Sequence, residues 1–140
     1  MKKEYSVHCF LLSLLIFCVL GCGNGQVGLS GKVTFTDDDT PLTVGMVNFS
    51  SDSFLARGAI SGDGSYTLGS TKEKDGLPPG KYNVYISGAV KEDVTSKTGL
   101  GMMPTMVSVI DPKFTTKNSG IVAEVTASTK TFDFKVDRAK

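Results

Sequence analysis

Apolar and polar residues alternate along most of the chain after residue 28, and this period of two predicts short β-strands. The first run covers residues 29–35, where Leu29, Val33 and Phe35 are separated by polar residues. Further runs of this kind occur at 45–49, 56–60, 66–68, 82–86, 107–110, 121–125 and 132–136. No window after the N-terminal segment has a convincing 3.6-residue apolar period, so we expect an all-β domain.

Turn residues separate these runs and favour a β-sandwich of about seven strands. Asp63-Gly64 is a tight-turn dipeptide, because glycine adopts positive φ without steric cost. Pro78-Pro79-Gly80 ends the connection between the runs at 66–68 and 82–86. Residues 88–118 lack regular alternation apart from 107–110, which predicts a long irregular connection there.

The N-terminal segment has the pattern of a secretory signal peptide. A basic start at Lys2 and Lys3 precedes an apolar run from Cys9 to Leu20, which is too short to span a bilayer as a helix. The run ends in Val19-Leu20-Gly21-Cys22, which resembles the bacterial lipobox, in which a cysteine is acylated and becomes the first mature residue. Cleavage by an ordinary signal peptidase near Gly21 or Gly23, and a buried N-terminal helix, are the alternatives.

Cleavage before Cys22 gives a signal peptide at 1–21, a flexible tether at 22–28 and a domain at 29–138. It also lowers the 15 basic and 14 acidic residues to 13 of each, so the mature chain is neutral. A chain without excess positive charge is not expected to bind nucleic acid. The only histidine, His8, leaves with the signal, and Cys22 is the one cysteine that remains. We therefore expect no disulfide in the domain.

The order and spacing of four segments resemble a known family. They are SGKVTFTDDDTPL at 30–42, GMVNFS at 45–50, GDGSYTL at 62–68 and PPGKYNVYISG at 78–88. Together they are similar to the transthyretin-like, carboxypeptidase regulatory-like domain, and more narrowly to small predicted lipoproteins of planctomycete-type bacteria. The resemblance implies a prealbumin-like Greek-key β-sandwich with no established activity. Phe114 departs from the family pattern, which has tyrosine there.

Catalytic and metal sites have little support in the sequence. One enzyme on the transthyretin scaffold hydrolyses hydroxyisourate with histidines, and a mature chain without histidine cannot use that chemistry or a histidine-dependent triad. We therefore expect no enzyme, no cofactor and no metal. Asp37, Asp38 and Asp39, or Asp63 with Ser65, offer oxygen ligands for calcium, but the spacing of an EF-hand loop is absent. Aspartates in turns usually cap the backbone, so structural turns are favoured.

Three aromatic residues are candidates for a carbohydrate platform, namely Tyr85, Phe54 and Phe114, although packing explains most of them. Tyr66 and Tyr82 lie at inward positions and are expected in the core, with their hydroxyls hydrogen-bonded. The methionines of the segment 102–106 suggest a copper(I) site, an adaptable partner surface or, most simply, a packed loop.

These features together predict a non-catalytic, lipid-anchored module of the cell envelope that serves a structural or protein-interaction role. A carbohydrate-binding accessory domain is the alternative. The expected partners are the membrane, through acylated Cys22, and an envelope protein or polysaccharide. The expected location is the cell envelope after secretion across the inner membrane, most simply the outer membrane.

Overall fold

A computed structural model describes residues 25–93 and 104–140, and over these ranges the chain is all-β. Its strands are β1 (Ser30–Phe35), β2 (Met46–Ser50), β3 (Leu55–Ala59), β4 (Ser65–Thr67), β5 (Gly80–Ser87), β6 (Val90–Asp93), β7 (Thr105–Ser108), β8 (Ile121–Val125) and β9 (Phe134–Val136). Within the same ranges the only helix is a short 3-10 turn, η1 (Pro112–Thr115), and no helix is long and apolar enough to cross a membrane.

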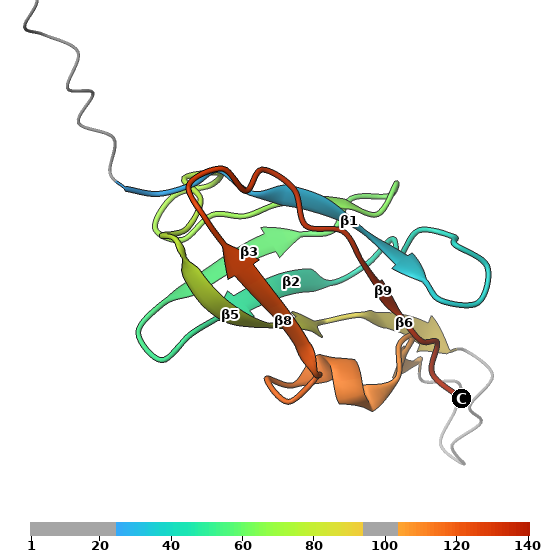
Figure 1. The fold of residues 1–140 in the computed structure, drawn as a ribbon. Helices are drawn as coiled ribbons and strands as arrows, with labels where there is room; N and C mark the ends of the chain where they lie inside the picture. Colours follow the sequence, from blue (N-terminus) through green and yellow to red (C-terminus); the bar gives the residue numbers. More distant parts are fainter. Residues whose placement is uncertain (1–24, 94–103) are drawn as a thin grey trace, which may run out of the picture.

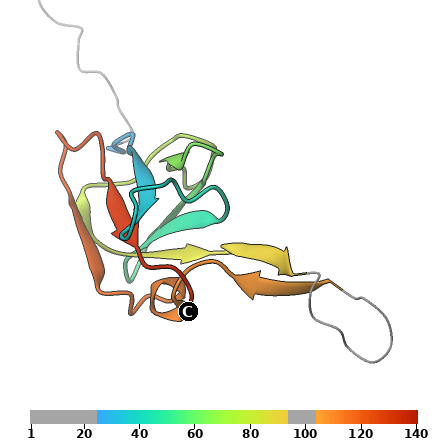
Figure 2. The same cartoon turned by 90° about the vertical axis from the view of Figure 1, so that its right-hand side faces the viewer.

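Two sheets face each other in a sandwich-like arrangement (Figure 1). One is the antiparallel sheet β3-β2-β5-β8. The other has the order β4-β1-β9, in which β1 pairs antiparallel with β4 and parallel with β9. Strands β6 and β7 form a separate hairpin that projects from the body (Figure 2). The all-β expectation from the alternating pattern is therefore confirmed.

The core lies between the two sheets and is built from the inward residues of the alternating runs. Val47 and Phe49 of β2 are fully buried, as are Val84 and Ile86 of β5. The Phe49 ring lies 5.6 Å from the Phe132 ring in a T-shaped contact, measured between ring centroids. It also lies 6.3 Å from the Tyr82 ring and 6.4 Å from the Tyr66 ring. Phe49 thus occupies the centre of an aromatic cluster.

The observed strands differ from the expected ones mainly in the segment 88–118. The sequence does not predict strand β6, because Val-Lys-Glu-Asp has no apolar alternation. In the structure neither β6 nor its partner β7 has a buried face. Strand β7 begins at Thr105, two residues before the expected run, and Ile110 is a buried residue beyond its end. Strand β9 is shorter than expected and begins at Phe134.

The range 22–28, expected to be a flexible tether, contains residues that belong to the folded body. Val27 is buried, and its backbone exchanges two hydrogen bonds with that of Leu77, at 2.7 and 3.1 Å. The side-chain amide of Gln26 donates to Ser70 Oγ at 3.2 Å. The chain therefore enters the domain beside the connection that leads from β4 to β5.

The two tyrosines expected in the core are buried, and each hydroxyl has a backbone acceptor. Tyr66 Oη donates to the carbonyl of Phe132 at 2.5 Å, and Tyr82 Oη donates to the carbonyl of Pro78 at 2.8 Å. Burial raises the pKa of both phenols, and the nearby carboxylate of Asp133 adds to the shift at Tyr66. Both hydroxyls therefore join a strand to a connecting segment.

We expect the free energy of unfolding to fall as the pH rises above about 10, the ordinary pKa of tyrosine. The unfolded chain then loses phenolic protons that the folded chain retains, so unfolding is favoured by linkage. Tyr66→Phe should make this loss less steep, and should cost about 1 kcal/mol at neutral pH because the carbonyl of Phe132 loses a donor. Urea unfolding at several pH values measures both effects.

Tyr85→Phe is the control for this experiment, because Tyr85 lies on the outer side of β5. A pH profile for Tyr66→Phe that matches the wild type above pH 10 would contradict the assigned role of the buried hydroxyl.

Candidate functional site

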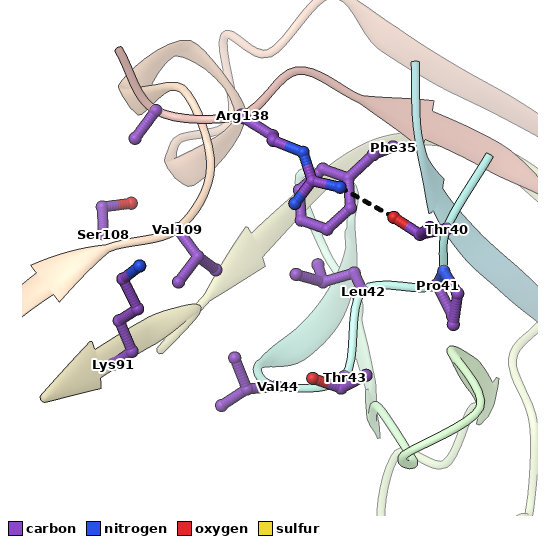
Figure 3. A pocket seen from close by; sticks show the side chains of 11 residues that line it. Phe35, Thr40, Pro41, Leu42, Thr43, Val44, Lys91, Ser108, Val109 and Arg138 are labelled. Atoms are coloured by element: carbon purple, nitrogen blue, oxygen red, sulfur yellow. Dashed lines mark hydrogen bonds between the residues drawn. The ribbon is translucent and has the colours of Figure 1, made fainter. Parts of the chain in front are cut away.

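A pocket of about 420 Å³ lies between the β1–β2 connection, the base of the β6–β7 hairpin and the C-terminal residues (Figure 3). Its lining residues come from these three segments and from the end of β1. They are Phe35, Thr40, Pro41, Leu42, Thr43, Val44, Lys91, Ser108, Val109, Arg138 and Ala139. The pocket combines an apolar floor with two cationic side chains, so it is a candidate binding site.

Arg138 forms one wall of the pocket, and the turn after β1 holds its guanidinium in place. Its Nε donates to Asp37 Oδ2 at 2.9 Å, and its Nη2 donates to Asp38 Oδ2 at 2.9 Å and to Thr40 Oγ1 at 2.7 Å. The guanidinium carbon lies 3.7 Å from the centroid of the Phe35 ring, in a cation–π contact. These four partners fix a side chain that is otherwise partly exposed.

Backbone pairing explains why Arg138 reaches this position. The chain after β9 runs beside the residues that follow β7, where the Asp111 amide donates to the carbonyl of Asp137 at 2.9 Å. One step further, the Ala139 amide donates to the carbonyl of Val109 at 3.2 Å. Arg138 is thereby held between two anchored residues and directed toward the turn after β1.

The same network shows what the acidic turn does in the structure. Asp37 and Asp38 form ion pairs with Arg138, and Asp39 forms an ion pair with Lys135. Over residues 25–93 and 104–140, no group of three or more histidine, cysteine, aspartate or glutamate side chains is arranged to hold a metal ion. The three carboxylates considered as calcium ligands thus bind basic side chains of the C-terminal segment.

Hydrogen bonds lower the pKa of Asp38 to about 2. The hydroxyl of Thr40 is the largest cause, followed by the amide of Thr40, while the guanidinium of Arg138 contributes less. The pKa of Arg138 is raised, chiefly through its hydrogen bond to Asp37. The Asp38–Thr40 turn would therefore keep its charge even without the arginine.

We expect Thr40→Val to raise the pKa of Asp38 more than Arg138→Gln does, because the valine removes the hydroxyl donor and keeps the backbone amide. A depressed carboxyl pKa stabilises the fold above the unfolded value near 3.9, and this contribution is lost as the pH falls through about 2. Titration of the Asp38 carboxyl carbon by NMR measures the shift. A larger shift in Arg138→Gln would contradict the ranking of the two partners.

The floor of the pocket is apolar and continuous with the core. Leu42 is 1% exposed and Phe35 is 5% exposed, while Val44 and Val109 are half-buried at the sides. Lys91 extends from β6 at one end of the pocket, beside Ser108 and Val109, and Arg138 lies at the other end above Phe35 (Figure 3). This arrangement can bind a molecule that has both an apolar part and a charged or polar end.

The other candidates from the sequence lie apart from this pocket. Asp63 Oδ1 accepts from the Ser65 amide at 3.0 Å and from Ser65 Oγ at 2.6 Å, so it caps the turn between β3 and β4. Phe114 is buried, with the Lys113 ammonium 4.6 Å from its ring centroid, and cannot present a carbohydrate platform. Phe54 is half-buried and packs edge-on against Tyr82.

Three sequence predictions, the signal peptide at 1–21, lipidation of Cys22 and the methionine segment, fall wholly or partly outside the described residues. Cys22 lies before residue 25, and Met102 and Met103 lie in the undescribed range 94–103. Met106 of β7 is described and is 57% exposed. Lipidation of Cys22 therefore stays a prediction.

Tyr85 is the remaining platform candidate, and its surroundings were not visible in the sequence. It lies on the outer side of the sheet β3-β2-β5-β8, directly across from Asn48, which in turn pairs with Arg57 of β3. Asn48 is 3% exposed, and its Nδ2 donates to Met46 O, Ser87 Oγ and Tyr85 O at 2.9, 3.0 and 3.3 Å. One half-buried ring and several polar side chains thus share this face.

Comparison with known proteins places the chain in no family. No family model matches it, and no curated protein sequence matches it. Among solved structures, it is similar to the crystal structure of a 9R-lipoxygenase from Cyanothece PCC8801, with 14% sequence identity and a TM-score of 0.37. The similarity covers 85% of this chain and 17% of that one, so the chain spans about a sixth of the lipoxygenase.

One expectation from the sequence is corrected by this comparison. The chain was expected to be no enzyme, and the solved structure that it resembles is an enzyme, so the exclusion of catalysis is withdrawn. At a TM-score of 0.37 the similarity gives no argument for lipoxygenase chemistry either. The family expectation from the four sequence segments stays a proposal.

Proposed function

We propose that the chain is a lipid-anchored β-sandwich module of the cell envelope that acts by binding a partner. The observation that carries the proposal is the short distance along the chain between Cys22 and the folded body, which Val27 joins by pairing with Leu77. Five residues span at most about 18 Å when fully extended. A diacylated or triacylated Cys22 would therefore hold the domain close to the membrane surface.

The finer fold assignment is part of the same proposal. A prealbumin-like Greek-key sandwich is supported by the way the chain changes sheets. The hairpin β2–β3 belongs to one sheet, β4 joins β1 in the other, and β5 returns to pair with β2. In the second sheet, β9 pairs parallel with β1 and forms the edge opposite β4.

Metabolic labelling with an alkyne analogue of palmitate tests the anchor. We expect the wild-type chain to carry the label and Cys22→Ser to carry none, because the thiol is the site of transfer. Cys18→Ser is the matched control, since it changes a cysteine of the apolar run and leaves Cys22 in place. Equal labelling of Cys22→Ser and the wild type would refute the lipid anchor.

A carbohydrate partner is the second candidate, and Tyr85 is the observation that favours it. Its ring lies on the outer sheet face, which the exposed Asn83 of the same strand shares, and an aromatic face with an adjacent amide suits stacking on a sugar ring. In a glycan-array screen we expect Tyr85→Ala to lose binding and Tyr85→Phe to keep it. Failure of the wild-type chain to bind any glycan would exclude this candidate.

A further inference from the structure

The pocket beside Arg138 has the size of a ligand site, and its lining has an apolar part and a cationic part. Its volume of about 420 Å³ lies within the range of roughly 300–1,000 Å³ that small-molecule sites occupy. Its floor and sides are apolar, through Phe35, Leu42, Val44 and Val109. Apolar pockets with a few converging polar groups are the usual form of such sites.

The two cations of the pocket are in different electrostatic situations. Arg138 is already paired with Asp37 and Asp38, so its charge is compensated inside the protein. Lys91 is exposed, and among the described residues its side chain has no ion pair within 4.0 Å. The uncompensated positive charge of the pocket is therefore at the Lys91 end.

We propose that this pocket binds a small organic carboxylate with a hydrocarbon body. The carboxylate pairs with the Lys91 ammonium, and the hydrocarbon lies along Leu42, Val44 and Val109 toward the Phe35 ring. A neutral hydrocarbon would gain nothing from the Lys91 ammonium, and a fully hydrated inorganic anion would leave the apolar floor in water. The amphipathic anion satisfies both parts, because burial of apolar surface and a charge-assisted hydrogen bond each favour binding.

Arg138 has a positioning role in this proposal. Its stacking on Phe35 and its bonds to the turn after β1 fix the far wall, so the pocket does not have to reorganise when the ligand enters. The inference is independent of the lipid anchor and of carbohydrate binding, because none of these residues takes part in either.

Calorimetric titration of the full chain in zwitterionic lipid nanodiscs tests the proposal, with empty nanodiscs as the blank. The probes are octanoate, octanol and octylamine, which share one hydrocarbon body and differ in the charge of the head group. We expect octanoate to bind most tightly and octylamine least. Loss of the charged donor in Lys91→Gln should weaken octanoate binding roughly five- to tenfold and leave octanol binding unchanged.

Two further variants separate the pocket from general charge effects. Lys81→Gln removes an exposed lysine from β5, away from the pocket, and should bind octanoate like the wild type. Val44→Asn places a polar group on the side of the pocket and should weaken octanoate and octanol alike. The proposal is overturned if octanoate binds no better than octylamine, or if Lys91→Gln and Lys81→Gln bind octanoate equally.

Discussion

Gly31→Ala should destabilise the protein by about 3 kcal/mol or more, which is a large part of the roughly 5–15 kcal/mol that stabilises a domain. A Cβ at Gly31 would overlap the carbonyl oxygen of Phe132, and would lie 2.8 Å from both the carbonyl carbon of Phe132 and Tyr66 Oη. The obstacle is backbone, so β1 and the segment before β9 would have to separate. Urea unfolding followed by tyrosine fluorescence measures the loss.

Gly28→Ala is the matched control, because a Cβ there meets no atom within 4 Å. Its free energy of unfolding should stay within about 0.5 kcal/mol of the wild type, as for most surface substitutions. If the two alanine variants lost similar stability, the cost would reflect glycine's general flexibility and the close approach at Gly31 would not be the cause.

Phe49→Ala should cost about 3–5 kcal/mol in the free energy of unfolding. Phe49 is fully buried, and its ring contacts three other aromatic rings that belong to both sheets or their flanking segments. Truncation would leave a cavity that these rigid rings cannot fill by small rotations. Chemical unfolding and the thermal midpoint measure the effect.

Phe54→Ala is the comparison for this variant, since Phe54 is half-buried and, among the rings of the described residues, contacts that of Tyr82 alone. It removes the same atoms with less loss of buried surface, so we expect a clearly smaller cost. A cost equal to that of Phe49→Ala would mean that the aromatic cluster is not the centre of the core.

Period-two alternation predicted the strands that have one buried face and one exposed face. Strand β5 is the clearest example, because Tyr82, Val84 and Ile86 are buried between exposed or half-buried neighbours. Strand β6 could not be predicted in this way, since its hairpin projects from the body and buries neither face. Alternation reports burial, and it carries no signal where a strand is held by backbone pairing alone.

The candidate site was less predictable because its residues come from separate parts of the sequence. The acidic turn after β1 was visible as a turn, but its pairing with Arg138 joins residues about 100 positions apart. Lys91 and Val44 have no local pattern that marks them as neighbours. Nothing in the run at 29–35 marks Gly31 as a site of close contact, and only the approach of the Phe132 carbonyl explains the absence of a side chain there.

The parallel pairing of β1 with β9 has a consequence for the order of folding. The Lys32 amide donates to Asp133 in this region across 101 residues, so β1 has only β4 as a partner until the C-terminal strand has been synthesised. Contacts of such long sequence separation form late, because the chain entropy of closing the loop must be overcome first. The sandwich is thus completed only by residues 134–136, and a polypeptide that has not yet emerged from the ribosome up to these residues would remain open along one edge of β1.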